Sequence, residues 1–204
     1  MLAGVGSGGV SGRFNRKVAP GTIFGAFQGA KVNGEDYIPQ AIADGADEID
    51  LVIPYKAYLA GNEACVTEMV TAVRAACPQA CLKVILETGE IRDSGKIRLA
   101  SELAISAGAD FIKTSTGKVA VNATLEAADI MLQAIRDSRK KVGFKPAGGI
   151  STVADAALYL SLADTIMGED WVMPSTFRFG ASGLLDDINA VLSGERSTAA
   201  ASGY

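Results

Sequence analysis

A chain of 204 residues, 49% apolar and 21% charged, is long enough to bury one substantial core and has the composition of an ordinary globular domain. Its net charge of −4 argues against broad nucleic-acid binding, which needs a basic face, and no apolar run approaches the ~20 residues that span a bilayer. The absence of histidine excludes Ser–His–Asp and Cys–His nucleophiles, so acid–base chemistry falls to carboxylates, lysines, tyrosines or water.

Three cysteines, Cys65, Cys77 and Cys81, are too few and odd in number for a disulfide framework. We expect them to be free structural thiols, since free cysteine is often simply buried, and we expect no metal site. The chain also begins without the basic end and apolar segment of a secretory signal. These features favour a reduced, cytoplasmic setting.

Residues 1–35 follow no regular pattern apart from one strand expected at 22–27, for which the sequence offers no convincing partner. The stretch "GVGSGG" at 4–9 fits a dinucleotide-binding motif, but no strand precedes it. We therefore interpret the first part of the chain as atypical and flexible.

Beyond residue 35, short β-type runs alternate with helical ones. The expected strands are 48–53, 82–87, 110–115, 142–145 and 176–180, and the expected helices are 62–76, 93–107, 123–140 and 152–162. Such alternation is typical of βαβ units around a parallel sheet. We expect a single barrel domain over residues 1–204, with a mobile tail at 196–204.

Two stretches share the frame Ala-Ile-x-x-Gly-Ala-Asp-x-Ile-x: "AIADGADEID" at 41–50 and "AISAGADFIK" at 104–113. Each has the pattern of a helix end, a glycine cap and a strand start. The last position is Asp50 in one copy and Lys113 in the other. The echo therefore predicts that both residues occupy equivalent places in successive βα units.

Strand alternation divides each expected strand into an apolar face and a face with ionisable groups. If the sheet closes into a barrel, the second face becomes the interior and its charges converge. Lys113 and Lys145 would lie close together if their strands are neighbours. The ionisable groups assigned to this face are Glu48, Asp50, Lys83, Glu87, Lys113, Lys145 and Arg178.

This charged interior has two interpretations. In the first it is a salt-bridge network in which Glu48, Asp50 and Glu87 neutralise the cations, although buried pairs often add little net stability. In the second, the excess of cations leaves one lysine beside another positive charge, which lowers its pKa from ~10.4 and leaves some neutral amine at pH 7. A neutral amine in a closed pocket attacks a carbonyl carbon and forms a Schiff base.

Glycine and serine lie between a strand and a helix start at two places, "KPAGGISTVADAA" at 145–157 and "RFGASGLLDDI" at 178–188. Backbone N–H groups at a helix N-terminus bind anions, and small residues let phosphate oxygens approach. In (β/α) barrels the loops after the last two strands commonly form a phosphate site. For either stretch by itself, an ordinary turn is the alternative.

Five ordered motifs carry a family resemblance: "GADEIDLVIPYKAYLAGN", "LKVILETGEI", "AGADFIKTSTGKVAVNAT", "VGFKPAGGI" and "FRFGAS". Together they resemble deoxyribose-phosphate aldolase, a class I aldolase family, from about residue 36 to the C-terminus. The resemblance implies an α/β fold of the (β/α)8 TIM-barrel type. It also implies reversible cleavage of 2-deoxy-D-ribose 5-phosphate to D-glyceraldehyde 3-phosphate and acetaldehyde, with no metal or organic cofactor.

The resemblance further implies roles for individual residues. Lys113 matches the Schiff-base lysine, Lys145 the second lysine that depresses its pKa, and Asp50 the carboxylate that relays protons through water. Tyr204 matches a C-terminal tyrosine that helps protonate the enamine. The implied substrate-binding residues are Thr116 and Lys118 and, for the phosphate, Gly148, Gly149, Gly180 and Ser182.

Two features depart from the family pattern. Gly183 follows Ser182 where many relatives carry a second serine, so we expect weaker phosphate affinity. Only 47 residues precede Glu48, whereas three complete βα units would need roughly 75–100. The first two barrel strands are therefore expected to be absent or replaced, which would leave unpaired sheet edges.

Three functions stay open on the sequence. The first is a deoxyribose-phosphate aldolase that uses Lys113, and the second is another Schiff-base aldolase or transaldolase acting on a different sugar phosphate. The third is a non-catalytic remnant that binds sugar phosphates, or that completes its barrel with another chain. The expected partners are a sugar phosphate and an aldehyde, without nucleic acid or membrane, and a homo-oligomer is left open.

Overall fold

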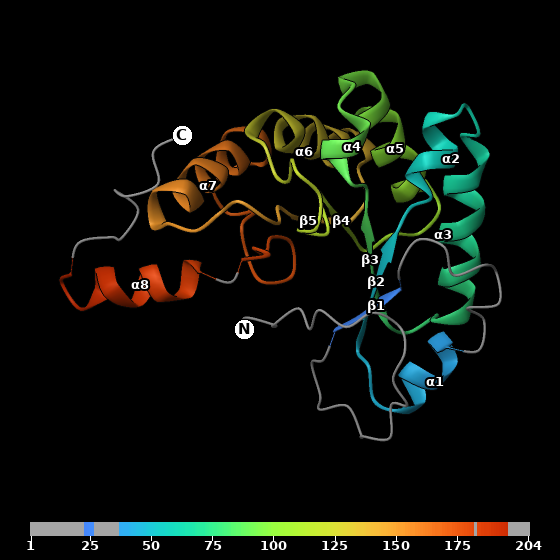
Figure 1. Ribbon diagram of the computed structural model, residues 1–204, viewed down its shortest axis with the longest axis horizontal. Helices are drawn as coiled ribbons and strands as arrows, with labels where there is room; N and C mark the ends of the chain where they lie inside the picture. Colours follow the sequence, from blue (N-terminus) through green and yellow to red (C-terminus); the bar gives the residue numbers. More distant parts are fainter. Residues whose placement is uncertain (1–22, 27–36, 182, 196–204) are drawn as a thin grey trace.

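The computed structural model describes residues 23–26, 37–181 and 183–195 (Figure 1). Three sequence predictions therefore lie outside the described residues: Ser182, Tyr204 and the tail at 196–204. Most of the segment at 1–35 lies outside them as well.

The described strands form one parallel sheet in chain order, β1 (Ile23–Ala26), β2 (Glu48–Val52), β3 (Cys81–Ile85), β4 (Phe111–Lys113) and β5 (Gly143–Lys145). The predicted strand at 176–180 is not continuous, but it runs parallel to β5 through the bridges Phe144–Phe177 and Ala147–Gly180. The four predicted strands from 48 to 145 are confirmed, each within two residues of its observed bounds. The strand expected at 22–27 corresponds to β1.

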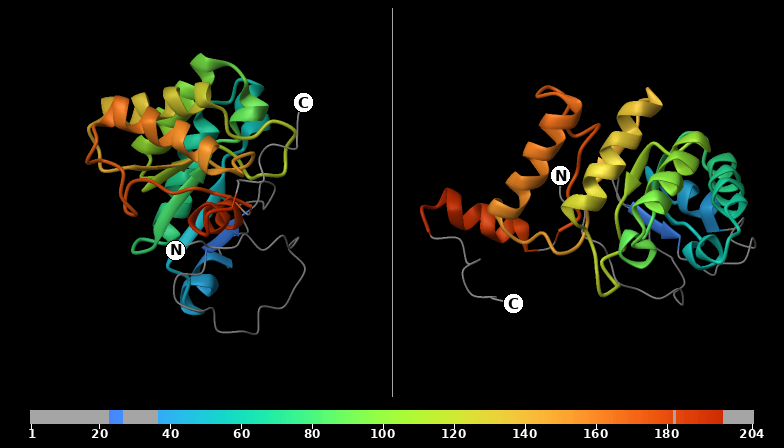
Figure 2. Two further views of the ribbon diagram at one scale, coloured as in Figure 1. Left: turned by 90° about the vertical axis from the view of Figure 1, so that its left-hand side faces the viewer. Right: turned by 90° about the horizontal axis from the view of Figure 1, so that it is seen from above.

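Helices follow the strands and cover one side of the sheet (Figures 1 and 2). They are α1 (Tyr37–Ala43), α2 (Tyr55–Leu59), α3 (Ala64–Ala76), α4 (Thr88–Ile91), α5 (Ser94–Ser106), α6 (Leu125–Ser138), α7 (Val153–Met167) and α8 (Leu184–Leu192). Four of them, α3, α5, α6 and α7, were predicted, and α7 runs five residues beyond its predicted end at 162. Within the described part of the chain, no helix combines the length and apolarity needed to cross a membrane.

Side-chain caps explain where the long helices begin. The Asp93 carboxylate accepts from the Lys96 N–H at the start of α5, and the Thr124 hydroxyl accepts from the Ala127 N–H at the start of α6. At the start of α7 the Thr152 hydroxyl accepts from the Asp155 N–H, and the Asp155 carboxylate accepts from the Thr152 N–H. These two hydrogen bonds form a complete capping box. These caps satisfy backbone donors that the first helical turn leaves without a partner.

Two expectations about strand pairing were wrong. The strand at 22–27 has a partner, because β1 pairs with β2 in the register Gly25 to Asp50. The two copies of the repeated frame are not in successive units, because β3 lies between them. The register of β3 with its two neighbours places Asp50 of β2 opposite Lys83 and Lys113 of β4 opposite Ile85, so Asp50 and Lys113 are at different heights in the sheet.

The predicted division of each strand into two faces is confirmed. Ile49, Leu82, Ile112 and Phe144 are at most 1% exposed and belong to the apolar core that the strands share with the helices. The alternate residues point to the other face of the sheet, where charged side chains contact one another. Period-two alternation therefore separates a core under the helices from a polar interior.

The sheet is strongly curved, as in a (β/α)8 barrel. Arg178, in the segment beside β5, forms an ion pair with Glu48 on β2, although β3, β4 and β5 lie between them. Four strand spacings in a flat sheet would amount to ~19 Å, farther than the two side chains reach. Parallel strands in chain order, outer helices and this curvature make the fold one of the (β/α)8 TIM-barrel type, as predicted.

Close packing on the inner face predicts a stability effect at Gly143. A Cβ atom there would lie 2.2 Å from the ring of Phe111, on which the Arg178 guanidinium stacks at 4.4 Å. We expect Gly143→Ala to lower the free energy of unfolding by about 1–3 kcal/mol, measured by urea denaturation. Gly95→Ala, in the first turn of α5, is the control: its Cβ would lie 3.3 Å from the end of the exposed Asp93 side chain. The higher helix propensity of alanine offsets this tight contact, so its loss should be below ~0.5 kcal/mol. Equal stability of the two variants would contradict this packing argument.

Candidate active site

Charged side chains gather on the inner face of the sheet, where water is largely excluded. Asp50, Lys83, Lys113 and Lys145 are each at most 5% exposed and come from four neighbouring strands, β2 to β5. Their positions follow from the strand alternation, which directs each of them away from the helices. An ionised group in such surroundings is costly unless another charge or a hydrogen bond offsets the loss of water.

Two carboxylates hold three of the cations. The Lys83 Nζ donates to Glu48 Oε2 at 2.9 Å and to Asp50 Oδ1 at 2.9 Å. The other Asp50 oxygen, Oδ2, accepts from the Lys113 Nζ at 3.1 Å. Arg178 completes the set by donating to Glu48 Oε1. Asp50 therefore bridges Lys83 and Lys113 across β2, β3 and β4.

These contacts set the ionisation of both carboxylates. Burial acts to raise the pKa of Asp50, but the positive charges of Lys113 and Lys83 outweigh it and lower that pKa below its ordinary value. Burial likewise acts to raise the pKa of Glu48, but hydrogen bonds and positive charges from Lys83 and Arg178 lower that pKa below its ordinary value. Both groups are consequently negative at neutral pH.

Lys145 has different electrostatic surroundings from Lys113, although the two residues are register partners on neighbouring strands. In the described part of the chain, no carboxylate lies within ion-pair distance of Lys145. Burial, followed by the positive charges of Lys83 and Lys113, lowers its pKa to about 8. A useful fraction of this amine is therefore neutral near physiological pH.

The lowered pKa of Lys145 predicts how the stability of the protein depends on pH. Its folded pKa of about 8 lies below the ordinary value of 10.5, so between these values the unfolded chain binds more protons than the folded chain. The stabilisation that follows is fully present above the ordinary value and is lost as pH falls through about 8. It amounts to about 3 kcal/mol.

The measurement is urea unfolding of the wild type and Lys145→Met from neutral pH to about 10.5. The pKa values of Tyr58 and Cys81 are raised by burial, to about 12 and about 11, so their titration changes stability in the opposite direction. Both groups are present in the two proteins, and the difference between the curves isolates Lys145. That difference should move in favour of the wild type as pH rises, and a constant difference would contradict the prediction.

Each interpretation of the charged interior is partly correct. A salt-bridge network exists around Glu48 and Asp50, and the expected pairing of those residues with cations is confirmed. Glu87 was wrongly placed in it, because its carboxylate turns to the Thr116 N–H at 3.0 Å. The predicted effect of one cation on another lysine is present at Lys145.

Glu87 instead supports the loop after β4. It is buried and adopts a left-handed backbone conformation with φ of 61°, which is rare for a residue with a side chain. Close by, a Cβ atom on Gly89 would lie 1.8 Å from the Val121 carbonyl oxygen, so the turn after β3 packs directly on this loop. The contact with Glu87 holds Thr116, which is half-buried, while Lys118 is exposed to solvent.

The glycine loops lie at the same end of the sheet, after β5 and after the segment 176–180. Gly148 and Gly149 have φ of 83° and 79°, and the Gly148 N–H donates to the Gly180 carbonyl. No Cβ could be placed at Gly180 without lying 3.2 Å from Lys145 Cε and closer still to Ala147. Gly180 therefore packs beside the buried Lys145, and Gly148 is hydrogen-bonded to Gly180.

Three backbone N–H groups at the start of α7 donate to carboxylates of the chain. The Ser151 and Thr152 N–H groups donate to Asp155, and the Val153 N–H donates to Asp187 at 2.8 Å. These three backbone N–H groups are therefore bound by two carboxylates of the chain itself. Gly149, where a Cβ would meet no atom within 4 Å, leaves open space above the loop.

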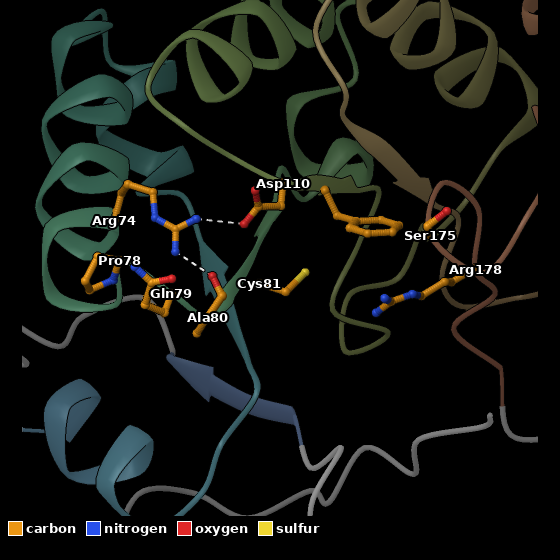
Figure 3. A pocket seen from close by; sticks show the side chains of 9 residues that line it. Arg74, Pro78, Gln79, Ala80, Cys81, Asp110, Ser175 and Arg178 are labelled. Atoms are coloured by element: carbon orange, nitrogen blue, oxygen red, sulfur yellow. Dashed lines mark hydrogen bonds and ion pairs between the residues drawn. The ribbon is translucent and has the colours of Figure 1, made fainter.

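A separate cavity of ≈ 410 Å³ opens at the amino ends of β3 and β4 (Figure 3). It is lined by Arg74, Pro78, Gln79, Ala80, Cys81, Asp110, Phe111, Ser175 and Arg178. Arg74 pairs with Asp110 at 2.7 Å across its wall. Lys113 and the glycine loops lie at the opposite, carboxyl end of the strands, where barrel enzymes place their chemistry. Among the described residues, no group of three or more acidic, cysteine or histidine ligands could hold a metal ion.

The comparisons with known proteins agree with this geometry. A family model described as DeoC/LacD family aldolase matches residues 20–186. The chain belongs to the DeoC/LacD family of aldolases. A curated deoxyribose-phosphate aldolase from Agrobacterium fabrum is 72% identical to it over 165 residues. Those residues make up 80% of this chain but only 64% of that relative.

Solved structures of this family also resemble the chain. A proposed deoxyribose-phosphate aldolase from Coccidioides immitis is 29% identical, with a TM-score of 0.70 over 84% of this chain and 63% of that one. The apo-form of a proposed deoxyribose-phosphate aldolase from Toxoplasma gondii ME49 is 25% identical, with a TM-score of 0.78 over 87% of this chain and 73% of that one. The family resemblance and the fold class inferred from sequence are thus confirmed.

Sequence reasoning placed Glu48, Lys83 and Arg178 on the charged face but did not assign them to the site. In the structure Lys83 contacts Asp50 directly, Glu48 shares Lys83 with Asp50, and Arg178 joins them through Glu48. Strand alternation was the available signal, since each of them lies on the same face as Asp50 or Lys113. Ser182 and Tyr204 lie outside the described residues and stay predictions.

Proposed function

We propose that this chain reversibly cleaves 2-deoxy-D-ribose 5-phosphate to D-glyceraldehyde 3-phosphate and acetaldehyde through a Schiff base on Lys113. One observation carries the proposal: in a DeoC/LacD family chain, Lys113 is buried at the carboxyl end of β4, bound to Asp50 and next in register to Lys145. Activity and substrate are proposals because the chain spans 64% of the curated relative.

In the first step the Lys113 amine attacks the aldehyde carbon of the open-chain sugar. The amine must first lose a proton, and Asp50 Oδ2 at 3.1 Å and the neutral fraction of Lys145 are the available acceptors. Loss of water from the carbinolamine then leaves the protonated Schiff base, an electron sink joined to Lys113.

In the second step the bond between C2 and C3 of the sugar breaks. A base removes the C3 hydroxyl proton, the C2–C3 electron pair moves toward the iminium, and glyceraldehyde 3-phosphate leaves. Protonation of the remaining enamine at C2 and hydrolysis release acetaldehyde and restore the amine. Tyr204 is the proposed donor to C2, with Asp50 relaying protons through water.

The phosphate is assigned to the glycine loops around Gly148, Gly149, Gly180 and Ser182, with Thr116 and Lys118 contacting the sugar. Support comes from the left-handed backbone of Gly148 and Gly149 and from the close packing of Gly180 against Lys145. Small residues let phosphate oxygens approach backbone donors closely. A cytoplasmic location and a homo-oligomer are further parts of the proposal, which rest on composition and on the family.

The test is the release of acetaldehyde from 2-deoxy-D-ribose 5-phosphate by the purified chain. Turnover supports the proposal, and no release under conditions where the Agrobacterium fabrum relative is active would contradict it. Donor and acceptor profiling separates this activity from another Schiff-base aldolase, since acetaldehyde is an unusual donor. Thermal stabilisation by the sugar phosphate without turnover would instead support a binding protein.

A further inference from the structure

An uninterrupted chain of ion pairs crosses the inner face of the sheet. It runs from Arg178 to Glu48, then to Lys83, Asp50 and Lys113. The distances are 2.9 Å from Glu48 Oε2 to Lys83 Nζ, 2.9 Å from Lys83 Nζ to Asp50 Oδ1, and 3.1 Å from Asp50 Oδ2 to Lys113 Nζ. Every link is within hydrogen-bond distance and joins opposite charges.

Each of the two carboxylates in this chain of ion pairs, Glu48 and Asp50, is shared between two cations. Glu48 offers one oxygen to Arg178 and the other to Lys83, while Asp50 offers one to Lys83 and the other to Lys113. A change at one end therefore alters the partners available at the next link. Glu48 begins β2 and Lys113 ends β4, so the chain connects opposite ends of the sheet.

Arg178 is the end that solvent reaches. Its side chain is 30% exposed and lines the cavity at the amino ends of the strands (Figure 3). It is held in place by a hydrogen bond from Nε to the Pro174 carbonyl at 3.0 Å and by stacking on Phe111. Lys83, at the middle of the chain, is 0% exposed.

We propose that Arg178 and Glu48 are positioning residues, which set the orientation of Asp50 and the charge around Lys113 from the far end of the sheet. This inference rests on the proposed function. Neither residue contacts the reacting atoms, and both act through Lys83. In a site largely closed to water, a charge several residues away along such a chain is screened far less than on the surface.

The ionisable groups that share the inner face of the sheet with Lys113 determine the direction of the effect. From the neighbouring elements these are Glu48 and Asp50 on β2, Lys83 and Cys81 on β3, Lys145 on β5 and Arg178 beside it. Burial keeps the Cys81 thiol neutral, and the four residues of β1 carry no ionisable side chain. Cations exceed carboxylates in this set, so removing either kind of charge changes the balance.

Two substitutions should shift the pH profile in opposite directions. Glu48→Gln removes a negative charge and should lower the pH at which acetaldehyde and borohydride trapping of Lys113 reaches half its maximum, by about 0.5–1 unit. Arg178→Met removes a positive charge and should raise that pH by a similar amount. Arg178→Lys keeps the charge and should restore the wild-type profile.

The experiment measures the trapping rate against pH for the wild type and these three variants, with thermal unfolding as a check on folding. Arg98→Met is the control, because Arg98 pairs with Glu102 and Asp137 on the helical surface and its loss should leave the profile unchanged. A purely structural role would lower the rate without moving the midpoint. Equal midpoints, or shifts in the same direction, would overturn the inference.

Failure of the proposed function would look different. In that case the wild type would not be trapped at any pH, whatever happens to the variants. The electrostatic effect of Glu48 and Arg178 on the site lysines is then tested without catalysis, by NMR titration of the Lys113 and Lys145 side-chain methylene groups in the intact protein. Opposite midpoint shifts in Glu48→Gln and Arg178→Met support the coupling, and unchanged midpoints contradict it.

Discussion

Replacing Lys113 by methionine is expected to lower kcat for 2-deoxy-D-ribose 5-phosphate cleavage by a factor on the order of 10⁴ or more. Without the amine, no Schiff base forms and no electron sink stabilises the breaking carbon–carbon bond. The same variant should fail to acquire an ethyl group from acetaldehyde and borohydride. Peptide mapping by mass spectrometry of the wild type should find that group on Lys113.

The substitution leaves the surrounding charges compensated, so loss of activity should not come from unfolding. Asp50 keeps its contact with the Lys83 Nζ at 2.9 Å, and methionine has a similar length to the lysine stem. Lys96→Met, on the exposed face of α5, is the matched control and should keep full activity. Trapping on another lysine in the wild type, or turnover by Lys113→Met, would refute the assignment.

The largest stability effect is expected at Lys83. Its fully buried ammonium lies between Glu48 and Asp50, and Lys83→Met would leave these two carboxylates facing each other without it. Removing one partner of a buried ion pair costs about 3–5 kcal/mol, and here two carboxylates lose a partner at once, although Asp50 keeps Lys113 and Glu48 keeps Arg178. Urea denaturation at pH 7 should show a loss of this size, and a loss below ~1 kcal/mol would contradict it.

Lys145→Met provides a matched comparison, since both lysines are buried on neighbouring parts of the same face. Lys145 has no carboxylate at ion-pair distance within the described residues, and its pKa is already lowered to about 8. Its replacement should therefore leave the free energy of unfolding at pH 7 unchanged or higher. Activity should nevertheless fall by ~10²–10⁴-fold, as expected for loss of an acid–base group.

Much of this site was accessible from local sequence patterns. The two-residue period of a strand depends only on the backbone, so it correctly grouped Asp50, Lys83, Lys113 and Lys145 on one face. The same alternation, repeated with helices between, was enough to predict parallel βαβ units. The motifs around Lys113 and Lys145 led to the family that the comparisons confirmed.

Sequence by itself thus determined the alternation, the family and which side chains face inward. The tertiary structure decided which charges meet: the register sets Asp50 opposite Lys83 and Lys113 beside Lys145, and curvature brings Arg178 to Glu48 across 130 positions of the chain. A left-handed turn likewise directs Glu87 to the loop at Thr116 rather than to a lysine. Ion pairs depend on distances of a few ångströms between strands, and those distances follow from long-range packing, which no local pattern encodes.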